Sequence, residues 1–151
     1  MIERIFTRSP IDGSEQAHHS VRVVAGAGIE GDRYFDRHEE PGQNISLIEA
    51  EEVEQFNAEH GRPNDFSIAG RNLVTRGVRL NALVGKEFSV GAVRLRGVEL
   101  CEPCLGLGVA LASADLAPPQ VVKAFLHKAG LRADVLSTGE VFVGAEVASA
   151  A

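Results

Sequence analysis

Sixteen glycines divide the chain of 151 residues into short apolar runs, and this spacing constrains the fold more than any other feature. Between the glycines, several runs are rich in β-branched side chains or alternate apolar and polar residues with a period of two. Both patterns are typical of short strands. The segments that we expect to be β are 1–8, 21–25, 78–100, 133–136 and 140–143. The last two flank Thr138-Gly139, a pair that predicts a hairpin turn.

Only two segments have the period of a helix. The first is predicted to begin near Ser46, because Ser46 and Glu49 have the spacing of a capping box, and to end at Gly61. Its apolar face consists of Leu47, Ala50, Val53 and Phe56. The second helix begins near Pro118-Pro119. Many short strands with only two helices predict a mainly β fold with helical decorations, of the β-barrel type, rather than a doubly wound parallel sheet.

The bulk composition predicts one domain over residues 1–151, with a frayed tail at 148–151. The formal net charge of −6 argues against general binding to nucleic acid or to an anionic membrane surface. The start of the chain is too short and too charged for a signal peptide, and no apolar run is long enough to span a bilayer. We therefore expect a cytoplasmic protein whose thiols are reduced.

The two cysteines of the chain, Cys101 and Cys104, flank Glu102 and Pro103. Because proline interrupts regular backbone hydrogen bonding, it predicts a loop or strand end where a thiol is accessible. A zinc site is not favoured, since the five histidines lack the paired ligand spacing that would complete it. A thioredoxin-type redox pair should open a helix, and the next predicted helix starts too late, at Pro118. The alternative is that one or both cysteines are small buried apolar residues.

Two further motifs are polar. Asp32 and Arg33 close a glycine-rich turn that starts at Gly28, and Arg71-Asn72 precedes a short apolar run. Each has a simple structural explanation, because Asp caps turns and Arg pairs with carboxylates. Five arginines nevertheless fall between residues 71 and 96, and guanidinium groups form bidentate bonds to phosphate or carboxylate. The sequence therefore allows one anion pocket in an acidic chain.

Taken in order, the motifs resemble the MOSC family, the domain named after the C-terminus of molybdenum cofactor sulfurase, and within it the small stand-alone bacterial members. The resemblance runs from about Ile2 to Val147. The motifs that carry it are Gly-Ile-Glu-Gly-Asp-Arg at 28–33, Asn-Ile-Ser-Leu-Ile-Glu at 44–49, Arg-Asn-Leu-Val at 71–74, the glycine-spaced run 77–91, Cys-Glu-Pro-Cys at 101–104 and the run 130–144.

The resemblance implies a MOSC-type β-barrel with a pocket for the pyranopterin of molybdenum cofactor, or for a sulfur-bearing relative. The signature cysteine matches Cys104, which would bind molybdenum or carry sulfur as a persulfide. The other signature positions match Asp32, Arg33, Arg71 and Asn72, which would shape the cofactor pocket. Cys101 is an auxiliary cofactor-binding thiol in this interpretation, and it leaves a disulfide or a persulfide relay open.

The same resemblance leaves the activity open between a molybdenum-dependent oxidoreductase, a sulfur-transfer protein, and a non-catalytic carrier or interaction domain. A sulfur donor or a molybdoenzyme is the expected partner. The sequence has neither the N-terminal barrel of the amidoxime-reducing enzymes nor a pyridoxal-phosphate site. We therefore do not expect it to generate a persulfide from free cysteine.

Overall fold

The structure is a computed structural model that describes residues 1–37, 39–103 and 105–149. Its strands are β1 (Ile2–Arg8), β2 (Glu15–His18), β3 (Ser20–Val24), β4 (Gly28–Ile29), β5 (Ile45–Glu49), β6 (Leu73–Thr75), β7 (Glu87–Val90), β8 (Val93–Leu100), β9 (Leu131–Val135), β10 (Gly139–Phe142) and β11 (Val147–Ser149). Its helices are α1 (Ala50–Glu59), α2 (Leu105–Leu111) and α3 (Pro118–Ala124), with short 3-10 helices η1 (Phe66–Ala69) and η2 (Leu80–Leu83).

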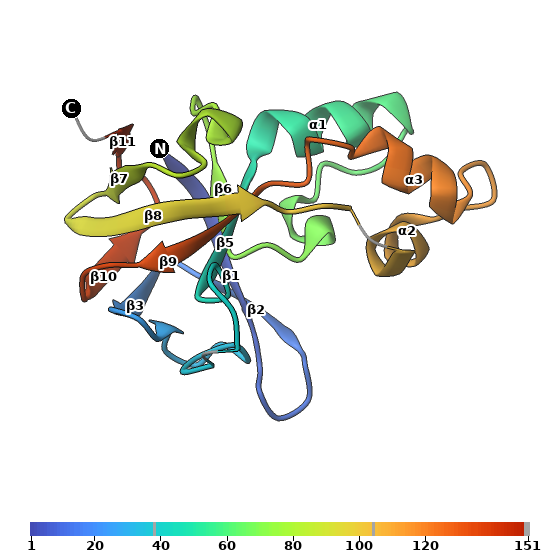
Figure 1. The fold of residues 1–151 in the computed structure, drawn as a ribbon. Helices are drawn as coiled ribbons and strands as arrows, with labels where there is room; N and C mark the ends of the chain where they lie inside the picture. Colours follow the sequence, from blue (N-terminus) through green and yellow to red (C-terminus); the bar gives the residue numbers. More distant parts are fainter. Residues whose placement is uncertain (38, 104, 150–151) are drawn as a thin grey trace.

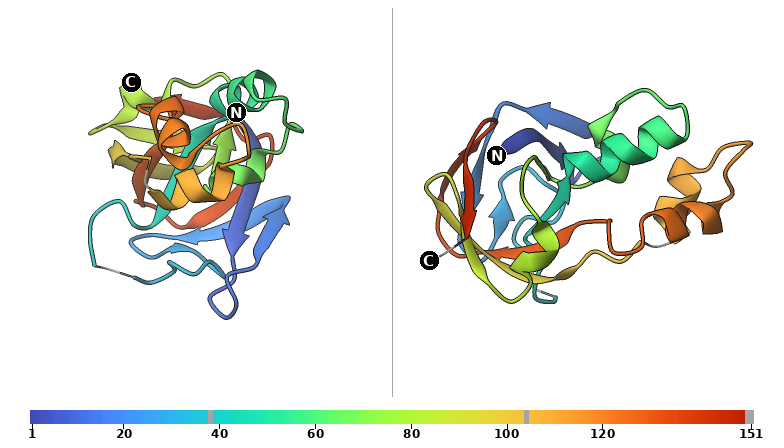
Figure 2. Two further views of the ribbon diagram at one scale, coloured as in Figure 1. Left: turned by 90° about the vertical axis from the view of Figure 1, so that its right-hand side faces the viewer. Right: turned by 90° about the horizontal axis from the view of Figure 1, so that it is seen from above.

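Eight strands form one curled sheet in the order β11-β7-β8-β9-β5-β6-β1-β2, and β10, β3 and β4 form a second, smaller sheet. Neighbouring strands are antiparallel except β5 and β6, whose parallel connection contains α1. The strands bend around one end of the molecule, while the three helices gather at the other (Figures 1 and 2). This arrangement confirms the predicted mainly β, barrel-like fold. None of the helices described is long and apolar enough to cross a membrane.

The central strands β5 and β6 separate two apolar cores. Leu47 and Leu73 pack into the core enclosed by the strands, whereas their neighbours Ile48 and Val74 pack into a second core with α1, α2 and α3. Successive side chains of a strand point to opposite faces, so both faces of these strands are buried. The two cores therefore meet at β5 and β6, which fixes the ends of these strands firmly.

The prediction that a helix begins at Ser46 is wrong, because residues 45–49 form strand β5 and the helix begins at Ala50. Leu47 is buried as the periodicity suggested, but it is buried as part of a strand. The Ser46 hydroxyl bonds the Asn72 side chain instead of a helix N-terminus. A continuous apolar strand buried on both faces is difficult to distinguish from a helical segment by pattern alone.

Two predictions near the C-terminus are also wrong. β9 and β10 do not form a hairpin, because β9 pairs with β5 and β8 while β10 pairs with β3 in the other sheet. Ala148 and Ser149, placed in a frayed tail, pair with Ser89 and Phe88 of β7. The turn at Thr138 therefore connects a strand of one sheet to a strand of the other, and β11 is an edge strand of the larger sheet.

Helix α2 was not anticipated from the sequence. It begins at Leu105, directly after the Cys101–Cys104 segment that follows β8. This removes one reason for rejecting a thioredoxin-type pair, namely that no helix follows the cysteines. The sheet order still separates this fold from a thioredoxin-like α/β unit, since its strands are antiparallel in every pair but one.

Candidate functional site

The candidate site follows a line across five adjacent strands of the larger sheet. Strand pairing places Leu100 opposite Leu131, Ser46 opposite Arg132, and Leu73 beside both Leu47 and Ile5. The residues next to these pairs therefore lie side by side, although up to about 125 positions separate them in the sequence. Loops 32–34 and 40–43 complete the walls of the cavities above this line.

Two cavities open along this line and share part of their walls. The larger has a volume of about 470 Å³, and the smaller, about 30 Å³. The residues lining both are Arg33, Tyr34, Ser46, Gly70, Arg71 and Asn72. Asp32 and Arg8 line only the smaller cavity, and Cys101 lines only the larger. Because of the shared wall, we treat the two as compartments of one site.

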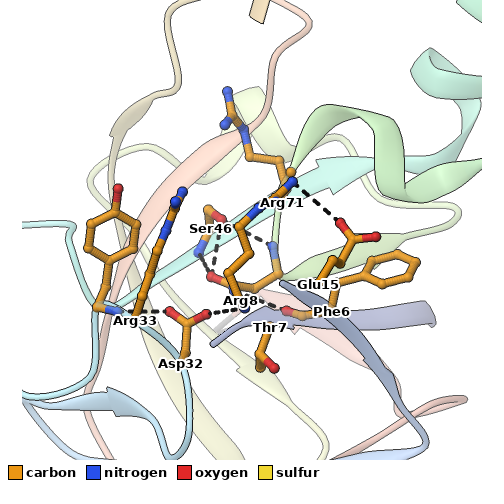
Figure 3. A pocket seen from close by; sticks show the side chains of 11 residues that line it. Phe6, Thr7, Arg8, Glu15, Asp32, Arg33, Ser46 and Arg71 are labelled. Carbon is orange, nitrogen blue, oxygen red and sulfur yellow. Dashed lines mark hydrogen bonds and ion pairs between the residues drawn. The ribbon is translucent and has the colours of Figure 1, made fainter. Parts of the chain in front are cut away.

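Asp32 holds the glycine-rich turn against the end of β1. Its buried carboxylate accepts hydrogen bonds from the backbone N–H groups of Arg8 at 3.0 Å and Tyr34 at 3.2 Å (Figure 3). Both oxygens are thus used on the backbone, as in the turn-capping explanation of this residue. Asp32 therefore positions Arg33 and Tyr34 at the cavity.

Asn72 ties three strands together at the floor of the site. Its side-chain oxygen accepts from the Ser46 backbone N–H at 3.0 Å, and its amide nitrogen donates to the Phe6 carbonyl at 3.0 Å. Its own N–H donates to the Ser46 hydroxyl at 3.1 Å. The amide is nearly buried, and these bonds satisfy both of its ends. Asn72 thereby fixes the position of its neighbour Arg71.

Arg71 and Arg33 are the cations that the site leaves available. Arg71 donates through Nε to the Ala129 carbonyl at 2.9 Å, and Arg33 lies over the Tyr34 ring. Among the described residues, neither guanidinium forms an ion pair with a carboxylate. A guanidinium held by its Nε keeps its outer N–H groups for a ligand, and a planar anion suits that geometry.

Arg132 is a third guanidinium in the larger cavity, but it is already paired. It contacts Glu99 at 2.8 Å and Glu40 at 2.5 Å, and its Nε donates to the Gly42 carbonyl. The two carboxylates raise the pKa of this guanidinium, despite the opposing effect of burial. Arg132 therefore fastens the 40–43 loop to β9, while Arg71 and Arg33 line the cavity and have no carboxylate partner in the described part of the chain.

Cys101 supplies a thiol to the wall of the larger cavity. Its side chain is buried, and burial raises the pKa of the thiol, with Arg71 and Arg132 acting in the opposite direction. The Cys101 N–H donates to the Gly130 carbonyl at 2.8 Å. The carbonyl one residue earlier, of Ala129, holds Arg71. One short segment before β9 therefore positions both the thiol and the guanidinium.

Gly130 allows that segment to approach β5. Its φ is 106°, a region that favours glycine, and a Cβ at this position would lie 2.0 Å from the Leu47 carbonyl oxygen. The chain can therefore pass this close to β5 only with glycine here. Gly130 therefore lets the segment whose carbonyls bond Arg71 and Cys101 lie against β5.

The structure brings four of the predicted pocket residues, Asp32, Arg33, Arg71 and Asn72, around the smaller compartment. The predicted auxiliary thiol of Cys101 lines the larger one with Arg71. Cys104, the predicted molybdenum ligand or sulfur carrier, lies outside the described residues. Its role stays a prediction. No cluster of three metal-binding side chains occurs in the described part of the chain.

Several lining residues were not anticipated from the sequence. They are Arg8, Glu15, Tyr34, Glu40, Gln43, Ser46, Glu99 and Arg132. Ser46 was assigned to a helix cap, and Arg8 belongs to a strand whose end has no motif of its own. A signal existed for Tyr34, which directly follows the Gly-Asp-Arg turn. Glu40 and Gln43 lie in a loop that Arg132 holds, and the pairing of distant strands brings the rest to the site.

The fold and the cavity define a small β-barrel-type domain with a cavity lined by guanidinium groups, carboxylates and a thiol. The MOSC domain model matches residues 35–148, and the chain belongs to the MOSC domain family. A search of curated proteins found no match.

Solved structures of other proteins have the same fold. The YuaD protein from Bacillus subtilis is 19% identical, with a TM-score of 0.81 over 97% of this chain and 92% of that one. YiiM from Geobacillus stearothermophilus is 17% identical, with a TM-score of 0.70 over 99% and 73% of the two chains. YiiM from Escherichia coli is 16% identical, with a TM-score of 0.69 over 100% and 70%. At these identities, the similarity establishes the fold.

Proposed function

We propose that this chain binds the pyranopterin of molybdenum cofactor in the two-compartment cavity. The observation that carries the proposal is that Arg33 and Arg71, without carboxylate partners among the described residues, line a cavity of about 470 Å³ together with a thiol. A volume of this size is typical of small-molecule sites. Membership of the MOSC family makes molybdenum cofactor the natural ligand to test.

The donor groups at the cavity fit this ligand. The outer N–H groups of Arg71 and Arg33 suit the phosphate of the cofactor. The side-chain amide of Gln43, which lines the larger cavity, can bond to the N–H-rich edge of a pterin. A soft thiolate suits molybdenum, and we propose Cys104, the position that resembles the family's signature cysteine, for that part. When bound, the cofactor supplies two-electron redox chemistry or a sulfur atom to be transferred.

The residues of the chain itself position the ligand and limit its contact with water. Asn72 holds Arg71 at the floor, and Asp32 holds Arg33 at the side wall. Arg132 holds the 40–43 loop at the cavity through Glu40 and the Gly42 carbonyl. Cys101 remains protonated to a higher pH than a free thiol because burial raises its pKa. We therefore assign Cys101 an auxiliary role beside Cys104.

The test is molybdenum analysis and intact mass spectrometry of protein purified from a host that makes the cofactor. We expect stoichiometric molybdenum, or a persulfide, in the wild type and in Cys101→Ala, and neither in Cys104→Ala. The opposite result would show that the family cysteine corresponds to Cys101. Wild-type content in both variants would exclude a cysteine role, and neither molybdenum nor a persulfide in any of the three proteins would favour a non-catalytic interaction domain.

A further inference from the structure

Tyr34 is an exposed aromatic side chain at the junction of the two compartments. It lines both cavities, and 40% of its surface is accessible. Phe142, on β10, has a similar exposed fraction of 49% and lines neither of them. Exposed aromatic side chains thus also occur away from the cavities. Exposure by itself therefore does not account for the place of Tyr34 at both of them.

The Tyr34 ring is held in place by its surroundings. Its backbone N–H donates to Asp32, and the preceding residue is fixed by a bond from the Arg33 N–H to the Arg8 carbonyl at 2.8 Å. The Arg33 guanidinium lies over the ring, with its Cζ 4.8 Å from the ring centroid. A planar cation over an aromatic face is an attractive arrangement, and it stacks two exposed planar groups one upon the other at the cavity.

From this geometry we infer that Arg33 and Tyr34 form a stacking platform for a planar conjugated ring of the ligand. Such rings stack on aromatic and guanidinium faces with little dependence on their edge groups. Arg33 is also one of the two guanidinium groups, with Arg71, that we propose bind the anionic group of the ligand. The ring and the negative charge of the ligand should therefore lie close together. The inference rests on the proposed function in that the cavity binds a ligand. The ring can belong to the pterin or to a substrate.

The chain offers an unusually clean way to locate the ring, because Tyr34 is its single tyrosine and it has no tryptophan. Protein with ring-labelled tyrosine gives NMR signals from Tyr34 alone. The probes are 2-naphthoate and decahydro-2-naphthoate, which have the same carboxylate and carbon skeleton and differ in planarity. We expect 2-naphthoate to shift the Tyr34 signals through its ring current and to bind on the order of tenfold more tightly than the saturated acid.

Variants separate stacking from folding. Tyr34→Phe should keep the tenfold preference for the planar acid, and Tyr34→Leu should lose it. Phe142→Leu, the matched change of an exposed aromatic residue away from the cavities, should keep it. Equal affinities for the two acids in the wild type, or Tyr34 signals that do not move at saturation, would overturn the platform.

A third probe, pterin-6-carboxylate, identifies the source of the ring. A larger Tyr34 shift and tighter binding than with 2-naphthoate support a platform for the cofactor ring, and an equal or weaker response supports one for a substrate ring. The two proposals also fail separately. Wild-type protein without molybdenum or pterin, but with a responsive Tyr34, overturns the proposed function alone. Protein that acquires molybdenum and pterin in a cofactor-competent host, but whose cofactor-free form has an unresponsive Tyr34, overturns the platform alone.

Discussion

Cys101 is a buried thiol near two guanidinium groups, and burial and the two cations act on its pKa in opposite directions. Arg71 and Arg132 favour its thiolate, but burial outweighs them and raises the pKa of the thiol. Because the thiolate is the reactive form, we expect slow reaction at neutral pH. This suits an auxiliary residue in the wall of the cavity.

Alkylation rates test this directly in Cys104→Ser protein, where Cys101 is the remaining cysteine. At pH 7 we expect native protein to react with iodoacetamide on the order of tenfold more slowly than the unfolded chain, with the gap closing as the pH rises. Arg71→Gln should slow the reaction further by removing a charge that favours the thiolate. Native and unfolded protein reacting at the same rate would show that Cys101 is neither buried nor shifted.

Glu49 is a nearly buried carboxylate at the junction of β5 and α1. Burial raises the pKa of this carboxyl, although the Leu80 N–H donates to it and Arg79 lies 4.0 Å away. A carboxyl with a raised folded pKa is more easily protonated in the folded state than in the unfolded state. Its contribution therefore becomes less favourable as the pH rises from the unfolded value near 4.5 through the folded one.

We accordingly expect Glu49→Gln to raise the Tm at pH 7, because the amide keeps an acceptor for Leu80 and carries no buried charge. The gain should shrink as the pH falls toward the unfolded pKa. Thermal melts from pH 4 to 8 measure it, with the exposed Glu146→Gln as a control that should leave the Tm unchanged. A lower Tm for Glu49→Gln at every pH would contradict this account.

At the residue scale, the order of short motifs identified Asp32, Arg33, Arg71 and Asn72 as neighbours, and the structure places them around one compartment. The order of motifs gave no indication of Arg132, which lies in an ordinary alternating strand. Arg132 reaches the site because β9 pairs with β5 and β8 at this point. Such long-range pairing has no local sequence signal.

At the scale of elements, Asn72 joins β1, β5 and β6 where they border the cavity. Asn72→Ala would leave the Ser46 N–H and the Phe6 carbonyl without their partners. Unsatisfied buried polar groups are costly, so we expect a loss of about 2–3 kcal/mol in the free energy of unfolding by denaturant. The matched control is Asn81→Ala, whose exposed amide bonds the His127 carbonyl, with an expected loss below about 1 kcal/mol. Equal losses would remove the special role of Asn72.

Helix α2 explains why some elements were missed. Its sequence contains two glycines, which disfavour a helix by propensity. A Cβ at Gly108 would lie 2.7 Å from the Pro118 carbonyl oxygen, so this glycine permits close packing of α2 on α3. The tertiary contact thus overrides the local preference. The predicted turn at Thr138-Gly139 is present, but the Ser137 and Thr138 hydroxyls accept from the N–H groups of Arg94 in β8 and of Ala25, just after β3.

At the scale of the whole molecule, two cores meet at β5 and β6, and the cavity opens where these strands begin. The cavity is thus built on the most firmly packed strands, while loops supply its walls. A site supported in this way keeps its cationic groups in fixed positions before a ligand arrives. In this setting, we propose, Arg71 holds the anionic group of a pyranopterin.

Pterin content of purified protein tests that claim most directly. We predict close to one pterin per chain in the wild type made in a cofactor-competent host, and on the order of tenfold less in Arg71→Gln. Arg94→Gln, which removes an exposed guanidinium paired with Glu87 on the far part of β8, should match the wild type. A wild type without pterin, or an Arg71→Gln variant with as much pterin as the wild type, would contradict the account.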